Sequence, residues 1–190
     1  MVAKINPVYH YCLDKSDQIV DVDEWWLAFA KENGAGELTR ANVVGRLLWD
    51  FVCDEPTRTL YQEIHAQVRS TGNSIIVPFR CDSPGLKRFM QVKISLAADR
   101  RLNYESRMVR VIARAAIHIL EPSRERSKAF LTMCSLCKRS LLEPTGWLEL
   151  QDISLQLRIF DQQRVPQLRY TICPNCSNSA AEAPPHVPTE

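Results

Sequence analysis

The alternation of apolar and polar residues predicts a sheet in the first two thirds of the chain. Residues 87–96 carry apolar side chains at every second position: Met90, Val92, Ile94 and Leu96. Similar strand-like patterns occupy residues 9–14, 18–22, 74–79 and 103–111. The polar run 14–17 predicts a hairpin turn between the first two strands. Residues 113–120 fit a helix and a strand about equally well.

Helical patterns separate the second predicted strand from the third. Asp23 is suited to cap a helix over residues 24–33, and Asp54 is suited to cap a longer one. An apolar stripe at helical spacing supports the longer helix, which Gly72 can end in a left-handed conformation. Residues 37–51 predict short helical turns. The predicted fold is α+β, with a five-stranded antiparallel sheet and helices on one face.

A change in composition divides the chain. Residues 121–129 are polar and charged and contain one proline, which predicts a linker. Residues 1–120 then form one domain, and residues 130–176 form a small cysteine module. That module is expected to be too small for a core of its own. Residues 177–190 are rich in Ala and Pro and are predicted to be disordered.

Charge and hydropathy argue against several classes of partner and cellular location. The formal net charge of +2 gives the whole chain no basic field, which disfavours nucleic acid as a partner. No apolar run approaches the roughly 20 residues of a membrane helix. The first residues lack the apolar stretch of a secretion signal, so a cytoplasmic location without a membrane is expected.

Four of the seven cysteines form two C-x-x-C pairs: Cys134 with Cys137, and Cys173 with Cys176. Two such turns supply the four thiolates of a tetrahedral structural zinc site, with Zn–S bonds of about 2.3 Å. The 35 intervening residues, 138–172, exceed the common zinc-ribbon spacing and require an inserted element within 146–160. Two redox dithiols or disulfides are the alternatives. A redox dithiol usually opens a helix after a strand, and neither pair shows that context clearly.

The order of elements and three short motifs resemble the PAS family of sensory domains. The segment 45–51 reads GRLLWDF, residues 17–23 resemble the opening of PAS domains, and residues 78–84 read PFRCDSP. The resemblance covers roughly residues 9–111. It implies a cavity between sheet and helices for a small ligand, and it implies a homodimer.

The cysteine module also carries a resemblance. Residues 133–139 read MCSLCKR, Trp147 follows, and residues 171–176 read TICPNC. This is similar to a "CSWCK…W…E…GICPxC" tail that follows sensory or receiver domains in bacterial signalling proteins. Leu136 replaces the common Trp, and residues 169–171 replace a usual Ser-His-Gly. The matching cysteines imply zinc binding and a zinc-ribbon-like module.

Two further residues are candidates for chemistry in the sensory domain. His65 lies on the long predicted helix, where it resembles the proximal ligand of haem-binding PAS sensors. Cys81 lies between Arg80 and Asp82, and the arginine is expected to favour the reactive thiolate, while the aspartate opposes it. A core histidine and a small residue at a strand end are the alternatives. Arg110 and Arg114 are expected to be solvated.

No phosphate-binding loop, H-E-x-x-H or G-x-S-x-G motif occurs in the sequence. The expected function is therefore a non-catalytic sensor or adaptor in bacterial signal transduction, acting through an unidentified protein partner. The alternatives are a transcriptional regulator that binds nucleic acid through a zinc ribbon, a haem sensor using His65, and a thiol oxidoreductase using the C-x-x-C pairs.

Overall fold

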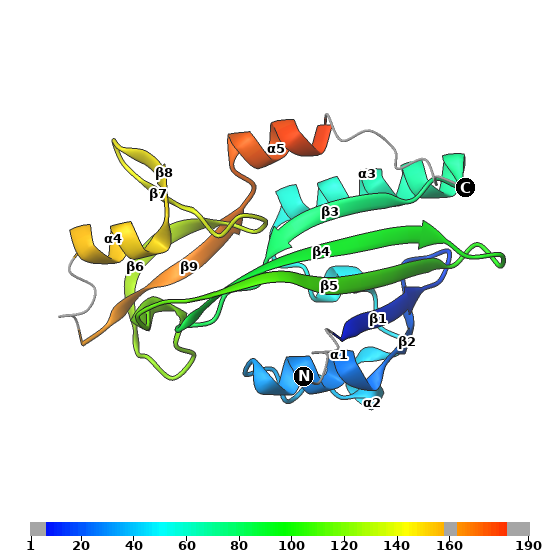
Figure 1. Cartoon of the computed structure of the whole chain (residues 1–190), viewed down its shortest axis with the longest axis horizontal. Helices are drawn as coiled ribbons and strands as arrows, with labels where there is room; N and C mark the ends of the chain where they lie inside the picture. The colour runs from blue at the N-terminus through cyan, green and yellow to red at the C-terminus, as the bar shows by residue number, and fades with distance from the viewer. Residues whose placement is uncertain (1–6, 158–162, 182–190) are drawn as a thin grey trace, which may run out of the picture. The chain divides into compact units, whose positions relative to one another are not determined.

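The computed structural model describes residues 7–157 and 163–181 and divides into two compact units. We call the first the sheet unit; its described residues are 7–78 and 90–109. We call the second the cysteine unit; its described residues are 79–89, 110–157 and 163–181. Figure 1 labels the α-helices and β-strands of both units.

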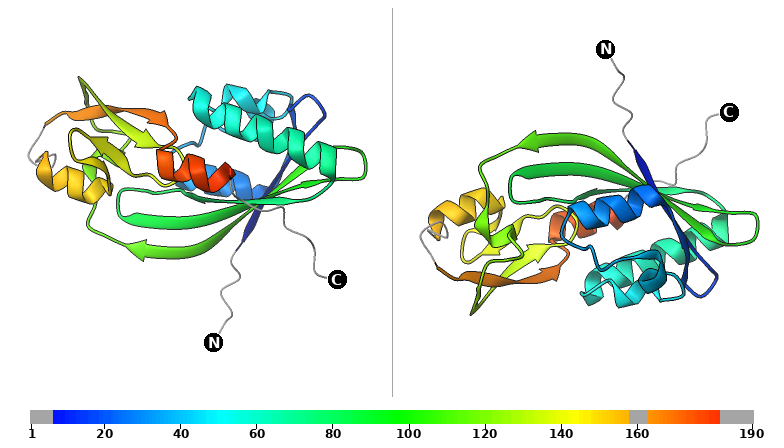
Figure 2. Two further views of the ribbon diagram at one scale, coloured as in Figure 1. Left: turned by 90° about the horizontal axis from the view of Figure 1, so that it is seen from above. Right: turned by 90° about the horizontal axis from the view of Figure 1, so that it is seen from below.

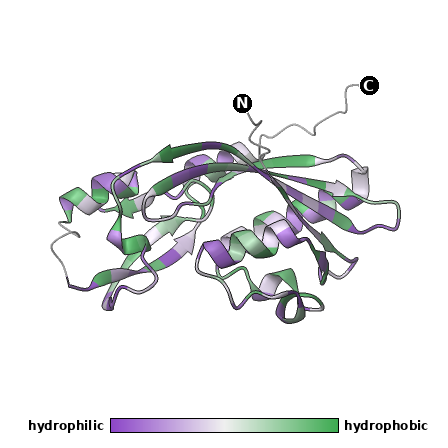
Figure 3. Ribbon diagram, turned by 60° about the horizontal axis from the view of Figure 1, so that its bottom comes forward, coloured by the Kyte–Doolittle hydropathy of each residue, from purple (hydrophilic) through white to green (hydrophobic). Residues whose placement is uncertain are grey.

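A five-stranded antiparallel sheet organises the sheet unit, as predicted. Its strand order is β2-β1-β5-β4-β3. The strands are β1 (Val8–Leu13), β2 (Ile19–Val22), β3 (Ile75–Arg80), β4 (Leu86–Leu96) and β5 (Leu102–Ala113). Apolar and polar residues alternate along β4, and Met90, Val92 and Ile94 are buried. Figure 3 colours the ribbon by hydropathy and shows apolar and polar segments interleaved along the strands. Strands β3, β4 and β5 each have residues in both units.

The predicted helices and their caps are confirmed. The helical elements are α1 (Glu24–Glu32), α2 (Arg40–Val43), η1 (Leu48–Asp50) and α3 (Glu55–Thr71). Asp23 accepts a hydrogen bond from the Trp26 amide at 2.6 Å, and Asp54 accepts one from the Thr57 amide at 2.9 Å. Gly72 ends α3 with φ of 75°, a conformation that costs glycine little.

Ring contacts place α1 and α3 on one face of the sheet. Tyr11 on β1 stacks on Tyr104 of the paired strand β5, with ring centroids 4.4 Å apart. Tyr9, two residues from Tyr11 on the same face, contacts Phe29 of α1 at 4.7 Å. His65 of α3 meets Tyr104 edge-on at 5.8 Å. The prediction of helices on one face is therefore confirmed.

The cysteine unit contains a second sheet, of four strands in the order β8-β7-β6-β9. These strands are β6 (Arg126–Cys134), β7 (Ser140–Leu142), β8 (Gly146–Leu148) and β9 (Val165–Thr171). The helical elements are η2 (His118–Leu120), α4 (Leu150–Gln156) and α5 (Pro174–Ala181). Strands β6 and β9 lie side by side and are parallel, whereas β6–β7 and β7–β8 are antiparallel (Figure 2).

The cysteine unit has a hydrophobic core, so the expectation that it lacks one is wrong. Its buried members come from η2, β6, α4, β9 and the residue before η2: Ile117, Ile119, Leu131, Met133, Leu150, Ile153 and Val165. Residues on both sides of the inserted segment contribute. The core forms because β6 and β9 pair across about 40 residues of sequence, a contact that no local pattern reveals.

The division into units differs from the predicted domain boundaries. Strand β6 begins at Arg126, inside the segment predicted as a linker. Residues 79–89 belong to the cysteine unit although they precede it in sequence. Residues 177–181, predicted to be disordered, lie in α5. The rest of that tail, 182–190, and residues 158–160 of the predicted inserted element lie outside the described residues.

Within residues 7–157 and 163–181, every helix falls short of the length or apolar character needed to cross a membrane.

Candidate metal centre

The sulfur atoms of the two predicted pairs gather at one point of the cysteine unit. The four Sγ atoms all lie within 4.8 Å of one another, and the cysteines are buried or half-buried. The sulfurs of Cys137 and Cys173 are 3.7 Å apart, and neither forms a disulfide. Two thiolates bound tetrahedrally at about 2.3 Å from one ion lie about 3.8 Å apart. The arrangement therefore fits a four-coordinate metal ion.

Parallel pairing of β6 with β9 brings these pairs together. Cys134 is the last residue of β6 and lies opposite Thr171, the last residue of β9. Parallel strands end at the same edge of a sheet, so the C-x-x-C turn after each strand reaches the same place. A parallel connection needs a dozen or more residues, usually with a helix. The segment 135–164, whose described part carries β7, β8 and α4, provides that connection.

Backbone amides surround the first thiolate of the centre. The N–H groups of Cys137 and Cys173 donate to the sulfur of Cys134 at 3.5 and 3.4 Å. Lys138, which follows the first pair, has φ of 59°, and its amide donates to the Cys134 carbonyl at 3.1 Å. The first pair thus forms a tight turn, and one amide from each pair donates to the same sulfur.

Hydrogen bonding makes the four thiols unequal. The Cys137 thiol, aided by backbone amides, lowers the pKa of Cys134 to about 4, and the same bond raises the pKa of Cys137. Burial, with a hydrogen bond to Cys173, raises the pKa of Cys176 to about 12. A metal ion must displace the protons of the raised thiols, so its affinity increases with pH.

The second pair has a helical context that the sequence did not reveal. Helix α5 begins at Pro174, directly after Cys173, and strand β9 precedes the pair. The sequence did not show this context clearly for either C-x-x-C pair, and the structure shows it for Cys173 and Cys176. A helix N-terminus favours a thiolate through its free N–H groups, whether that thiolate binds a metal or acts as a nucleophile.

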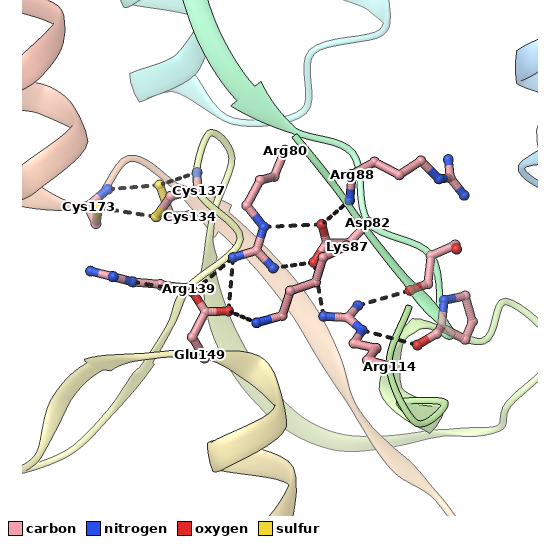
Figure 4. Close-up of polar contacts among 12 residues, drawn as sticks. Arg80, Asp82, Lys87, Arg88, Arg114, Cys134, Cys137, Arg139, Glu149 and Cys173 are labelled. Atoms are coloured by element: carbon pink, nitrogen blue, oxygen red, sulfur yellow. Dashed lines mark hydrogen bonds and ion pairs between the residues drawn. The ribbon is translucent and has the colours of Figure 1, made fainter. Parts of the chain in front are cut away.

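A buried network of ion pairs lies beside the cysteines in the same unit (Figure 4). Arg80 donates to both oxygens of Glu149 at 3.0 and 2.9 Å and to Asp82 at 3.1 Å. Lys87 reaches Glu149 at 2.9 Å. The backbone amide of Arg80 donates to the carbonyl of Leu136, inside the first cysteine pair, at 2.7 Å. One arginine at the end of β3 therefore contacts both the network and the first C-x-x-C turn.

Sequence reasoning missed two members of this network. Arg114 was expected to be solvated, but its side chain is only 7% exposed and donates to Asp82 and to the carbonyls of Ser83 and Pro84. Glu149 lies 69 residues from Arg80 in sequence. Burial would raise the pKa of Glu149, but Lys87 and Arg80 hold it below its usual value. No local signal connects these residues.

His65 occupies an internal polar position in the sheet unit. Its Nδ1 lies 2.9 Å from Asp17 Oδ1, and its Nε2 is hydrogen-bonded to the Tyr104 hydroxyl. In the neutral imidazole, Nδ1 carries the proton because a carboxylate only accepts, and Nε2 then accepts from the tyrosine hydroxyl. Arg69 also donates to Asp17, at 2.7 Å. Both ring nitrogens are engaged, which leaves neither for an iron ion in this arrangement.

Cys81 does not have the environment of a reactive thiol. Burial, the largest influence, raises the pKa of Cys81, although Arg88 and Lys138 act in the opposite direction. Arg80, the neighbour expected to favour a thiolate, instead binds Asp82 and Glu149. The geometry fits the alternative of a small residue at a strand end.

A surface cavity of about 260 Å³ lies on the other face of the sheet from α1 and α3. Its lining includes His10, Lys93, Glu105 and Arg107. His10 follows Tyr9 on β1, so its side chain lies on the opposite face of the sheet from Tyr9. The expected ligand cavity was between sheet and helices. There, stacked rings of Tyr11, Tyr61 and Tyr104 fill space around His65.

Comparison of the sequence with known protein families gave no match. Comparison with curated proteins likewise gave no significantly similar relative.

Proposed function

We propose that this protein is a non-catalytic sensor or adaptor of bacterial signal transduction, with a structural zinc ion held by Cys134, Cys137, Cys173 and Cys176. The single observation that carries the proposal is the cluster of four sulfurs within 4.8 Å. A closed shell of four protein ligands leaves no position for a substrate, which is typical of structural rather than catalytic zinc. Four soft thiolates select zinc over magnesium or calcium.

The sensory part of the proposal rests on the order of elements. Two strands, a helical middle and three strands form one antiparallel sheet with helices on one face, the arrangement expected of a PAS-like domain. In this proposal the sheet unit perceives a small ligand or forms a homodimer in the cytoplasm. A ligand transmits a signal only when it binds two conformations with different affinity.

Metal analysis combined with an absorbance spectrum tests the proposal on the purified full-length chain. We expect close to one zinc per chain and no absorbance beyond the aromatic band. Ser substitution at Cys134 is expected to abolish stoichiometric zinc, whereas Cys53→Ser, at an exposed cysteine outside the cluster, is expected to retain it. A Soret band would instead indicate haem, and a protein with no bound metal would contradict the zinc assignment.

The position of the second pair at the start of α5 favours a second candidate, a thiol oxidoreductase. The two functions differ in the number of free thiols. A zinc-loaded centre protects four of seven cysteines from a thiol reagent until a chelator is added. A redox dithiol reacts without chelator and forms a disulfide between Cys173 and Cys176 on mild oxidation.

A further inference from the structure

The small net charge of the chain conceals an unequal division between the two units. The described residues of the cysteine unit contain 12 Lys and Arg against 6 Asp and Glu, a formal charge of +6. Those of the sheet unit contain 10 against 13, a formal charge of −3. A divalent ion on four thiolates carries −2 and leaves the cysteine unit at +4. Charge asymmetry of this kind favours a polyanionic partner.

Much of this positive charge is paired internally, but some reaches the surface of the second sheet. Arg80, Lys87 and Arg114 bind Asp82 or Glu149 in the buried network. Lys128 and Arg169, by contrast, are exposed on β6 and β9. Among the described residues, neither has a carboxylate within ion-pair distance.

The register of β6 and β9 places a set of side chains on the face of the sheet that the core does not use. Phe130 pairs with Gln167, and Thr132 pairs with Arg169. The alternating positions Leu131, Met133, Leu168 and Tyr170 belong to the core or pack against it. Phe130, Thr132, Gln167 and Arg169 therefore share the opposite face. Lys128 is exposed on β6 two residues before Phe130, next to a shift in register. We call the four residues together with Lys128 the β6–β9 platform, and Lys128 is included for its exposed charge and its place on β6.

An exposed aromatic ring stands at the centre of the platform. The Phe130 residue is 55% exposed, although it sits on a central strand of the sheet. The guanidinium of Arg169 lies 4.6 Å from the centroid of that ring. A nucleobase can stack on an exposed phenyl ring or on a guanidinium plane, and phosphates pair with neighbouring cations.

We propose that the β6–β9 platform binds single-stranded nucleic acid with little sequence preference. Phe130 and Arg169 stack bases, and Lys128 and Arg169 neutralise phosphates. The Gln167 amide nitrogen donates to the Ser127 carbonyl at 3.0 Å, so Gln167 offers its amide oxygen as an acceptor, and Thr132 offers its hydroxyl. Single strands are favoured over duplexes because stacking on a side chain requires a base that is free of its own stack. This inference goes beyond the sensor role and does not depend on which metal the cysteines hold.

Fluorescence anisotropy with a labelled oligo-dT 15-mer, titrated with the full-length protein across a series of KCl concentrations, tests the proposal. We expect a dissociation constant at or below about 100 µM at low salt, and weaker binding as salt rises. Phe130→Ala is expected to weaken binding about tenfold without changing the salt dependence. Arg169→Gln is expected to weaken binding and to reduce the slope of log K against log [salt] by about 0.7.

Matched controls separate the platform from general charge and hydrophobicity. Leu155→Ala removes another exposed apolar side chain of the same unit, and Arg101→Gln removes an exposed arginine of the sheet unit. Both should bind the oligonucleotide as the unchanged protein does. Metal content and thermal melting, measured on every variant, confirm that each is folded and loaded, so loss of zinc is not mistaken for loss of the platform.

Three results would overturn the inference. The first is no anisotropy change at low salt. The second is equal affinity for a duplex together with no effect of Phe130→Ala, which indicates non-specific attraction of a polyanion. The third is a change in oligomeric state on sedimentation of Phe130→Ala with unchanged oligonucleotide binding, which indicates that the ring contacts a second copy of the chain.

Discussion

The two units of this protein solve the same stability problem by different means. The sheet unit packs aromatic rings and aliphatic side chains between one sheet and its helices, and it buries one chain of hydrogen bonds, from Asp17 through His65 to Tyr104. The cysteine unit has a smaller aliphatic core, a buried set of ion pairs and four clustered cysteines. The stability of the sheet unit depends mainly on burial of apolar surface. The cysteine unit adds buried charges and thiols, which stabilise the fold only when each has its partner.

This difference predicts different sensitivities. Buried apolar side chains tolerate the loss of a single contact in proportion to the volume removed. Buried charges and metal ligands do not, because removing one partner leaves the others desolvated and uncompensated. A single substitution should therefore be enough to unfold the cysteine unit, whereas the sheet unit should tolerate one. The following experiments test that contrast.

Removal of one buried cysteine of the cluster should have the largest effect on stability. Cys173→Ser is expected to lose the bound metal and, with it, a contribution on the order of 10 kcal/mol to folding of the cysteine unit. Two-dimensional amide NMR should show the resonances of residues 110–157 collapsing toward random-coil positions while most of those of the sheet unit persist. Cys53→Ser is the control. A folded, metal-free cysteine unit in the variant or after chelation would show that its aliphatic core suffices.

Removal of the shared carboxylate in the ion network should come next. In Asp82→Asn, Arg114 stays buried without its carboxylate and Arg80 keeps only Glu149, which is expected to cost about 3–5 kcal/mol in the free energy of unfolding. Urea denaturation followed by near-UV circular dichroism measures this loss. Asp99→Asn breaks an exposed pair with Arg101 and should leave the curve almost unchanged. Equal midpoints for both variants would contradict a structural role of the network.

Removal of one buried hydrogen bond in the sheet unit should lower its stability by a smaller amount. Tyr104→Phe removes the hydroxyl that donates to His65 and leaves a buried ring nitrogen without its partner, at a cost of about 1–3 kcal/mol. Differential scanning calorimetry of the metal-loaded protein measures the shift of the sheet-unit transition. Tyr61→Phe serves as the control, because no described residue hydrogen-bonds to the Tyr61 hydroxyl. If the transition temperature shifts no more in Tyr104→Phe than in this control, the hydrogen-bond chain does not contribute to the stability of the sheet unit.

The smallest expected effect is a change in how the stability of the sheet unit depends on acidic pH. Burial would raise the pKa of Asp17, but hydrogen bonds from His65 and Arg69 hold it below the ordinary value of 3.8. A depressed folded pKa contributes stability above the ordinary value, and this stability is lost as pH falls through the lower folded value. Asp17→Asn should therefore flatten the acid side of the stability–pH profile of the sheet unit. Asp50→Asn, at an exposed carboxylate, should leave the profile similar to that of the unchanged protein.

Local patterns were sufficient for most of the sheet unit. The period-two alternation of β4, the caps Asp23 and Asp54 and the stop at Gly72 each act within a few residues, so the sequence alone located those elements. The four cysteines were also found from spacing, because only a narrow range of turns lets two thiolates bind one ion. The long spacing between pairs looked anomalous only because the parallel pairing of β6 with β9 was unknown.

Contacts between distant residues decided the rest. Whether Arg114 is solvated or buried depends on Asp82, Ser83 and Pro84, which lie about 30 residues away in sequence. The charge of each unit likewise depends on which segments fold together, and residues 79–89 join a unit that lies mostly after them. The chain by itself thus determined most helices and strands of the sheet unit, and the cysteine pairs that cluster, through short-range stereochemistry. Only the tertiary structure decided which charges are buried, which face of β6 is exposed and which histidine nitrogens are engaged, because those properties arise from pairing across long stretches of sequence.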